Sequence, residues 1–232
     1  MQRIASLGIL VLVVAPVWAF PPYRSTDADT AAAGILELRL GLARIQRQDS
    51  SSSRSTPLTR MNLGIGERSE IIAEFEHSAD EHHLEEGAVG FKWARLEDGV
   101  GMGVETLLLL PVQSHQSGSG IESQFVATLQ RQHWQLHVNV GGFYDPRGQD
   151  TERGLRGSLL AEFPRGSARP GLELFVKDTR EQKPRVQAGA GIIKQYRLFE
   201  LRTGIHFGLS ENAPDVEASL WLAWRWQVSS GE

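Results

Sequence analysis

Cysteine is absent from the 232 residues of this chain. Its absence excludes a disulfide scaffold, a thiol nucleophile, thiolate zinc sites and iron–sulfur ligation. A dominant charge is absent as well, because 24 lysines and arginines stand against 28 aspartates and glutamates and leave a net charge of -4. Without a basic field to attract a polyanion, we expect no nucleic-acid partner.

Long apolar runs are scarce, and the one uncharged, mostly apolar run that approaches the length of a membrane span lies at the N-terminus. Residues 1–19 start with a positive charge at Arg3 and end with Val17 and Ala19, small residues that a signal peptidase accepts at its cleavage site. This pattern predicts a secretory signal peptide that is cut after Ala19. The alternative is an uncleaved membrane anchor, since the uncharged run over 4–20 is about 17 residues long, near the lower limit for a span.

Past this segment, apolar and polar residues alternate with a period of two, which predicts β-strands. In 35–45, for example, Leu38 and Leu40 alternate with Glu37 and Arg39. Twelve such segments follow one another, and no helical period competes with them. The chain is therefore predicted to be all-β.

The links between these segments alternate in length. The stretch IQRQDSSSSRSTP is long, GERS is short, SADEHHLEEG is long and LEDGVG is short, and the alternation largely continues beyond them. Outer-membrane barrels have this arrangement, with short turns in the periplasm and longer loops outside the cell. An even number of strands also places both chain ends in the periplasm.

Two-sided strands fit either a soluble β-protein, whose apolar face is a core, or a membrane barrel, whose apolar face meets lipid. Glycines on the polar face, aromatic residues near the strand ends and the export signal favour the barrel. We therefore predict an antiparallel, up-and-down transmembrane β-barrel of about 12 strands in the cell outer membrane. A periplasmic β-sandwich or a lipocalin-like binding protein is the alternative.

This architecture divides the chain into four parts. They are a signal peptide (1–19), a periplasmic N-terminal arm (20–33), the outer-membrane β-barrel (34–226) and a C-terminal tail (227–232). The expected partners are outer-membrane lipid, the barrel-assembly machinery during insertion and a small-molecule solute.

Four stretches carry a resemblance to a known family: AAAGILELRLGLARI, TRMNLGIGERSEIIAEFEHS, GAVGFKWARLEDGVGMGVETLLLLPVQ and WQLHVNVGGFYDP. In strand rhythm and glycine placement, the chain from about residue 30 to 226 is similar to the outer-membrane transporters associated with the meta-pathway of phenol degradation. The resemblance implies an outer-membrane β-barrel that passes small organic compounds. It carries no functional residues that could be transferred to this chain.

Charged side chains recur on the polar face of the strands and are expected to line the lumen. Two interpretations remain open: a ladder of ion pairs that fills the barrel, since buried charges need partners, or a lining that selects the solute. The predicted lumen residues are Glu37, Arg39, Glu74, Glu76, Lys92, Glu105, His137, Arg156, Glu162, Glu173, Lys177, Glu200, Arg202, His206, Glu217 and Arg225. The predicted membrane-interface aromatics are Trp93, Trp134, Phe163, Trp224 and Trp226.

The sequence gives little support for metal binding or catalysis. His77, His82 and His83 share one acidic segment, but their spacing matches no zinc pattern, and a solvated loop is the expected role. An outer-membrane lipid hydrolase would need a nucleophile and a base, for which the candidates are Ser117, Ser158, Ser219, His115, His137 and His206. Because no GxSxG motif and no nucleotide-binding motif is present, we expect no enzyme, metal site or cofactor.

The function that these observations favour is a channel or transporter for small solutes, with hydrophobic or aromatic compounds as candidates. Its gate would be formed by the loops at 46–57 and 78–86 or by the arm at 20–33. A barrel of this size encloses either a narrow passage or a lumen plugged by side chains. An open pore, a closed structural barrel and a ligand-binding barrel therefore remain alternatives.

Overall fold

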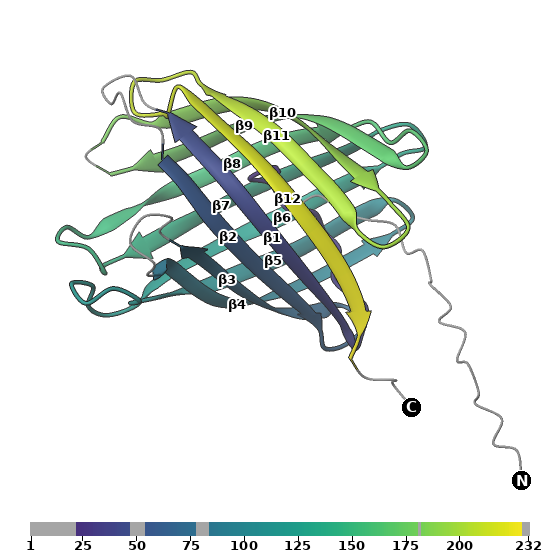
Figure 1. Ribbon diagram of the computed structural model, residues 1–232, viewed down its shortest axis with the longest axis horizontal. Helices are drawn as coiled ribbons and strands as arrows, with labels where there is room; N and C mark the ends of the chain where they lie inside the picture. The colour runs from purple at the N-terminus through teal and green to yellow at the C-terminus, as the bar shows by residue number, and fades with distance from the viewer. Residues whose placement is uncertain (1–21, 47–53, 78–83, 181, 229–232) are drawn as a thin grey trace, which may run out of the picture.

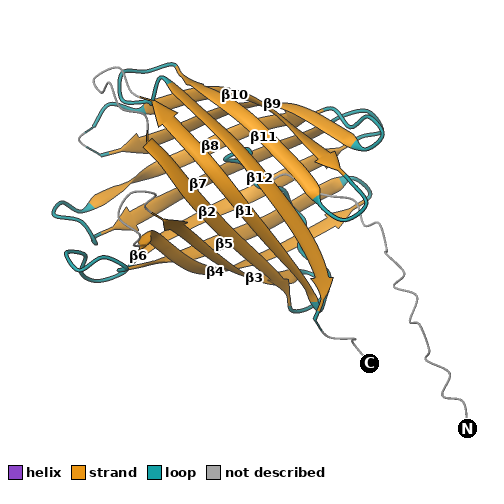
Figure 2. Cartoon of the chain, in the orientation of Figure 1, coloured by secondary structure: helices purple, strands orange, loops and turns teal. Residues whose placement is uncertain are grey.

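Twelve antiparallel strands form one closed barrel in the computed structural model, which describes residues 22–46, 54–77, 84–180 and 182–228 (Figure 1). The strands are β1 (Ile35–Gln46), β2 (Arg54–Gly64), β3 (Ser69–His77), β4 (Leu84–Glu97), β5 (Val100–Leu110), β6 (Gly120–Gln130), β7 (Gln135–Asp145), β8 (Glu152–Glu162), β9 (Ala168–Thr179), β10 (Arg185–Gln195), β11 (Glu200–Gly208) and β12 (Val216–Gln227). Strands and loops make up all of the described chain (Figure 2), and within it no helix is long and apolar enough to cross a membrane. The predicted all-β, twelve-stranded fold is confirmed.

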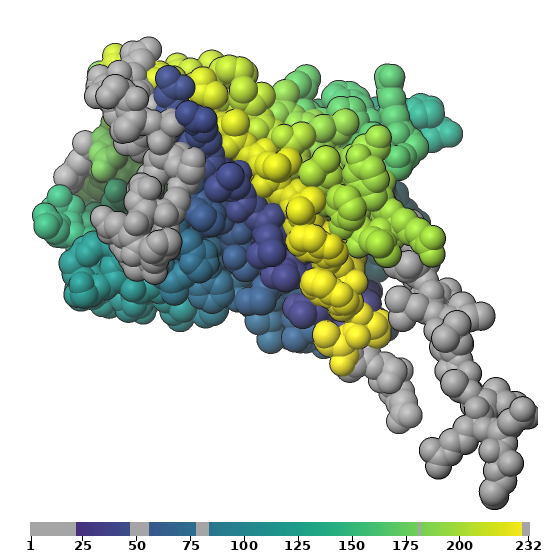
Figure 3. All heavy atoms as spheres, in the orientation of Figure 1, coloured from purple at the N-terminus to yellow at the C-terminus, as the bar shows by residue number. Residues whose placement is uncertain are grey.

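Closure comes from the first and last strands. Each strand pairs with its neighbour in sequence, and β1 also pairs with β12 along its whole length. In the space-filling view the two strands lie side by side on the outer surface (Figure 3). A closed barrel has no free strand edge, so every strand has a backbone partner on both sides.

The outer surface of the barrel is apolar and the inner surface is polar. On β5, Val104 is 43% exposed, whereas the next residue, Glu105, is 3% exposed. The same contrast occurs on β4, where Phe91 is exposed and Lys92 is buried. A soluble β-protein has the opposite arrangement, so the apolar surface corresponds to the lipid-facing band of a membrane barrel.

The predicted alternation of loop lengths separates the two ends of the barrel. Short turns join β2 to β3, β4 to β5, β6 to β7, β8 to β9 and β10 to β11 at the end where β1 begins and β12 finishes. The tightest turn is Asp98-Gly99, whose positive φ angles of 51° and 74° suit a two-residue hairpin. Longer links lie at the opposite end, although β2 already begins at Arg54 and β4 at Leu84, inside the predicted loops 46–57 and 78–86. The residues 47–53 and 78–83 lie outside the described ranges.

The N-terminal arm differs from its predicted place. We expected residues 20–33 in the periplasm, but the described part of the arm lies inside the barrel, where Ser25, Thr26 and Asp27 are buried. The physical reason is that the barrel wall presents polar side chains that need partners and small residues that leave space. The arm supplies the partners and fills the space. Its backbone donors and acceptors are satisfied there by side chains of the wall instead of by water.

A close contact inside the barrel joins the two strands that close it. Trp221 of β12 stands opposite Gly41 of β1, and its ring is buried in the lumen. A Cβ atom on Gly41 would lie 2.3 Å from that ring, so only glycine leaves room for it. The sequence-based analysis did not identify Trp221 as an interior residue.

We expect Gly41→Ala to destabilise the folded barrel by about 1–3 kcal/mol, because the ring of Trp221 must leave a packed position. Urea unfolding of protein folded in detergent micelles, followed by heat-dependent gel mobility, measures this change. Gly66→Ala in the β2–β3 turn is the control, since nothing lies within 4 Å of a Cβ placed there. Equal unfolding free energies for the two variants would contradict the packing argument.

Candidate functional site

The arm crosses the lumen from the β3 wall towards the β9 wall. At its C-terminal end, the backbone N–H of Ala31 donates to the Glu70 carboxylate at 2.7 Å, and that of Ala28 donates to the Thr128 hydroxyl at 2.8 Å. In the middle, the amide of Asn139 bonds the arm twice: its Oδ1 accepts from the N–H of Thr26 at 2.6 Å, and its Nδ2 donates to the Thr26 carbonyl at 2.8 Å. The wall thus replaces the strand partner that an extended segment normally needs.

The densest set of contacts to the arm involves the carboxylate of Glu173 on β9. It accepts hydrogen bonds from the backbone N–H groups of Arg24 at 2.9 Å and Ser25 at 2.7 Å, and also from the Ser25 hydroxyl. His206 Nε2 lies 2.7 Å from the same carboxylate, and Ser158 Oγ lies 2.8 Å from Ser25 Oγ. Because several donors converge on one buried anion, removing Glu173 would take the partner from the backbone N–H groups of both Arg24 and Ser25.

A fully buried cation fixes the centre of the arm. Lys92 of β4 donates to the Thr26 hydroxyl at 3.1 Å and to the Asp27 carboxylate at 3.2 Å, and its Nζ lies 4.0 Å from Glu70. An unpaired ammonium group would be very costly at this depth, so Asp27 and Glu70 compensate its charge. The arm thus supplies Asp27, one of the carboxylates that neutralise Lys92.

Small residues in the wall make room for the first part of the arm. Tyr23 packs with Leu160 and Ile193, and a Cβ on Gly171 would lie 2.6 Å from the Tyr23 hydroxyl oxygen. A Cβ on Gly204 of β11 would lie 2.7 Å from Pro22. Glycines on the polar face favoured a barrel in the sequence analysis, and here the space beside Gly171 and Gly204 is filled by the arm.

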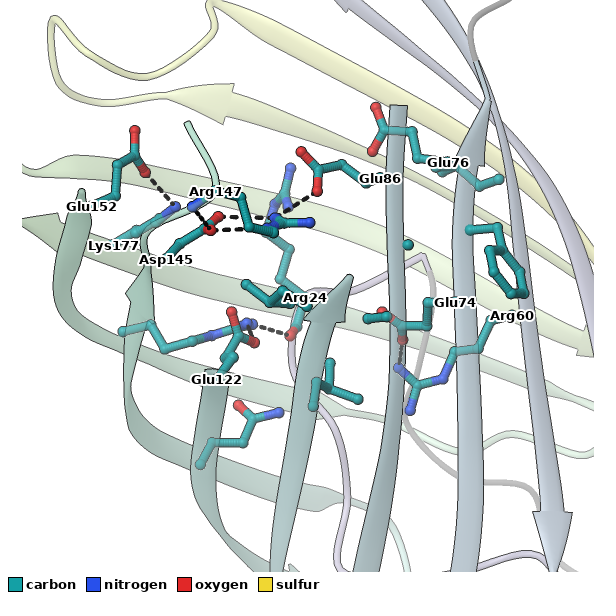
Figure 4. Close-up of a pocket in the computed structure, with 18 of the residues that line it drawn as sticks. Arg24, Arg60, Glu74, Glu76, Glu86, Glu122, Asp145, Arg147, Glu152 and Lys177 are labelled. Carbon is teal, nitrogen blue, oxygen red and sulfur yellow. Dashed lines mark hydrogen bonds and ion pairs between the residues drawn. The ribbon is translucent and has the colours of Figure 1, made fainter. Parts of the chain in front are cut away.

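Above the arm, at the long-loop end, lies a cavity of about 1110 Å³ that we call the vestibule (Figure 4). The arm residues 22–26 form its floor. Charged side chains dominate its wall and pair across the strands: Arg60 with Glu74 and, at 3.0 Å, Glu105; Arg156 with Glu122; Lys177 with Glu152 at 3.6 Å; and Arg24 with Glu217. The vestibule is therefore a charged chamber closed below by the chain's own N-terminal segment.

Arg147 enters the vestibule from the loop between β7 and β8 and was not among the predicted lumen residues. It donates to Asp145 at 2.8 Å, to Glu86 at 2.7 Å and to the carbonyl of Leu110 at 2.8 Å. Hydrogen bonds from its side chain to Asp145 raise the pKa of Arg147 above its ordinary value. Loop residues have no strand period, so the sequence pattern carried no signal for Arg147 or for Arg24 in the arm.

The predicted lumen residues occupy two levels of the barrel interior. Six of them line the vestibule: Glu74, Glu76, Glu105, Arg156, Lys177 and Glu217. The others form the deeper lining: Glu37, Arg39, Lys92, His137, Glu162, Glu173, Glu200, Arg202, His206 and Arg225. In the deeper part, Glu37 pairs with Arg39 at 2.5 Å, with Arg202 at 3.0 Å and with Arg225 at 3.1 Å, which is an ion-pair network of the kind that fills a lumen.

The five predicted interface aromatics lie towards the short-turn end of the barrel. Trp93, Trp134, Phe163 and Trp226 are exposed on the outside, and Trp224 is half-buried on the same face of β12. Outward aromatic rings at one level suit the boundary between hydrocarbon and headgroups.

Three of the candidate catalytic residues, His137, His206 and Ser158, make structural contacts. His137 bonds the Thr128 hydroxyl at 3.0 Å and lies 3.3 Å from Glu162, while His206 and Ser158 belong to the seat of the arm around Glu173. No group of three potential metal-binding side chains occurs among the described residues, and His82 and His83 lie outside them.

Comparison with known proteins places this geometry among outer-membrane channels. No protein-family model matches the chain, and no curated protein matches it significantly. The COG4313 outer membrane channel from Pseudomonas putida F1 has a TM-score of 0.67 at 9% identity, covering 86% of this chain and 98% of that one. The NanC porin has a TM-score of 0.60 at 8% identity, covering 81% of this chain and 97% of that one. At these identities the likeness shows the fold: a barrel of the kind that outer-membrane channels have.

One arm residue has a strongly shifted acidity. Burial and, secondarily, the charge of Asp27 raise the pKa of Asp29 from its ordinary 3.8 to about 7. Lys92 opposes the shift, Glu70 adds to it, and Arg225 is a further charge near this carboxyl. Since the docked arm favours the protonated acid, docking is strongest below about pH 4 and weakens as the pH rises to about 7.

We therefore expect the arm to leave its seat more readily as the pH rises from 4 to 7, and Asp29→Asn to remove this dependence. The chain has no cysteine, so the thiol-labelling rate of Ser25→Cys reports the undocked fraction. Dividing by the rate of Ser25→Cys/Asp29→Asn at each pH cancels the titration of the thiol itself. The ratio should rise on the order of tenfold between pH 4 and 8, after allowance for solvent screening. A flat ratio would show that Asp29 does not control docking.

Proposed function

We propose that this protein is an outer-membrane channel for small solutes, in which the N-terminal arm is the movable closure. The observation that carries the proposal is the vestibule of about 1110 Å³, whose floor is formed by arm residues 22–26. A permanent plug would ordinarily be fixed by a hydrophobic core, whereas this one is held mainly by hydrogen bonds between its backbone and side chains of the wall. The fold shared with outer-membrane channels supports the same class of function and the same membrane.

The contacts of the arm suit reversible release. A hydrogen bond that water can replace contributes about 0.5–1.5 kcal/mol net between neutral groups and about 1.5–3 kcal/mol when one group is charged, as Glu173 and Lys92 are. Each contact of the arm is therefore exchangeable for a contact with water once water enters the lumen. Among the described residues, two small buried clusters include the arm, Tyr23 with Leu160 and Ile193, and Ala28 with Ala94 and Val126, and Pro22 lies beside Gly204. A solute that binds the open state more tightly would shift the population towards it.

The lining of the vestibule favours small organic cations. Nine carboxylates and six basic side chains line it among the described residues, which leaves a local charge of -3. The carboxylates are Glu74, Glu76, Glu86, Glu105, Glu122, Asp145, Asp150, Glu152 and Glu217, and the bases are Arg24, Arg60, Arg147, Arg156, Lys177 and Arg180. Such an excess raises the local concentration of cations.

An apolar part of the solute would also find contacts. Leu58 of β2, Leu107 and Leu109 of β5, and Trp221 of β12 line the same cavity. This strip suits the hydrophobic or aromatic part of a small organic solute that also carries a positive charge.

A disulfide between arm and wall tests the closure. Because Ser25 Oγ and Ser158 Oγ lie 2.8 Å apart, Ser25→Cys/Ser158→Cys should form a bond that locks the arm, and the chain offers no competing thiol. In planar bilayers we expect the oxidised protein to stay closed and a reductant to restore the wild-type conductance. Deletion of residues 22–30 should raise the conductance at least severalfold, since it removes the floor of the vestibule.

The single variants Ser25→Cys and Ser158→Cys serve as controls, and neither should respond to the oxidant. If the deletion variant folds, as judged by heat-dependent gel mobility, and conducts no more than the wild type, then the arm is not the closure. If neither protein conducts, the barrel is structural or ligand-binding and the channel proposal is wrong.

Neutralising three carboxylates of the vestibule tests whether it selects cations. We expect Glu74→Gln/Glu76→Gln/Glu86→Gln to lower the cation-to-anion permeability ratio by a factor on the order of two to three, because it removes the acidic excess of the vestibule. Reversal potentials across a salt gradient measure the ratio. The matched control, Glu67→Gln/Glu97→Gln/Asp98→Asn, removes the same charge at the short turns and should leave the ratio nearly unchanged. Equal effects of the two triple variants would refute selection in the vestibule.

A further inference from the structure

The short-turn rim of the barrel has two halves with different charge. On the turns β2–β3 and β4–β5, the bases Arg68 and Arg95 both pair with Glu97, and Glu67 and Asp98 add further negative charge. On the turns β6–β7, β8–β9 and β10–β11, in contrast, the exposed charged residues are all basic. They are Arg131, Arg165, Lys194 and Arg197, with His133 beside them.

Three of these bases form what we call the rim cluster: Arg165, Lys194 and Arg197. The β8–β9 and β10–β11 turns that carry them are held together, since the backbone N–H of Gln195 donates to the carbonyl of Ser167 at 2.8 Å. Lys194 also stands opposite Ala168 in the strand register, next to the turn with Arg165. The bases therefore converge on one part of the rim although they come from two hairpins.

No carboxylate pairs with the rim cluster within the described part of the chain. Lys194 Nζ instead lies 5.5 Å from the centre of the Tyr196 ring, a cation–π contact. Arg165 and Arg197 are exposed, as is Gly166 beside Arg165. This contrasts with the acidic neighbours of Arg68 and Arg95 and leaves a concentrated positive charge facing outward.

The surroundings of the cluster indicate a lipid boundary. Lys194 is on the outward face of β10, since its neighbour Ile193 is buried inside, and so its stem runs along lipid-facing surface and its charged end reaches the interface. Phe163, Tyr196 and Leu198 are exposed beside the bases. Outward aromatic rings next to unpaired bases match a headgroup layer that carries negative charge.

We propose that the rim cluster is a binding site for the phosphate headgroup of an anionic phospholipid in the leaflet that meets the short turns. The proposal rests on the placement of the barrel in the outer membrane, where short turns face the periplasm. It does not depend on conduction. The side of the barrel with the β8–β9 and β10–β11 turns would hold anionic lipids in preference to the side with the β2–β3 and β4–β5 turns.

The test is lipid retention by the folded, full-length mature barrel in detergent, measured by native mass spectrometry. Phosphatidylglycerol is titrated into the wild type, into Arg165→Gln/Arg197→Gln and into the matched variant Arg68→Gln/Arg95→Gln. We expect the rim-cluster variant to bind phosphatidylglycerol at least tenfold more weakly, since each base near an anionic headgroup contributes about fivefold, equivalent to about 1 kcal/mol. The matched variant should change the apparent Kd less than twofold.

Three results would overturn the proposal. Equal weakening in both variants would show that total charge, not the cluster, holds the lipid. Equal affinity of the wild type for phosphatidylcholine would show that the negative headgroup is not recognised. A dimer in the wild type that dissociates in Arg165→Gln/Arg197→Gln would assign the surface to a second copy of the chain. Because heat-dependent gel mobility and conductance are measured separately, failure of the channel proposal would be distinguishable from each result.

Discussion

The carboxylate of Glu173 is the contact on which the state of the lumen depends. A buried anion inside a barrel must be compensated, and this one is compensated by backbone N–H groups and a hydroxyl that belong to the arm. Lys92 is a buried cation that is compensated in the same way, by the carboxylate of Asp27 in the arm. The arm thus forms the floor of the vestibule and is also the partner of buried charges of the wall. Without it, water would have to solvate these groups.

The need to compensate buried charge is met differently in the two levels of the interior. In the deeper level, arginines and glutamates such as Arg202 and Glu37 satisfy one another within the wall and leave little room for solute. In the vestibule, pairs such as Lys177 and Glu152 are partly exposed and remain hydrated. Of the two sequence-based alternatives, the filling ladder matches the ion pairs of the deeper level, and the selective lining is what we propose for the vestibule.

The fold could be predicted from the sequence because its signals are local. The alternation of Leu38 and Leu40 with Glu37 and Arg39 depends on neighbouring residues, and so do the loop lengths and the Asp98-Gly99 turn. The arm could not be placed, because residues such as Thr26 and Asn139 meet across 113 positions of sequence and have no periodic signature. Arg147 escaped for a similar reason, because it lies in a loop. Trp221 escaped for a different one: the period of two puts it on the same face of β12 as Glu217 and Arg225, but the prediction selected only polar residues on that face.

The pairing of β1 with β12 has a consequence for the order of assembly. Loop closure across nearly the whole chain is the slowest kind of contact to form, so the seam is completed late. The arm precedes β1, and its partner residues are spread from Glu70 on β3 to Glu217 on β12, which is 193 positions from Arg24. We therefore expect the segment of the described chain that is synthesised first to be among the last to be ordered, because its contacts need wall residues from most of the barrel. On this view, an unplugged barrel precedes the form in which the chain's own beginning fills the lumen.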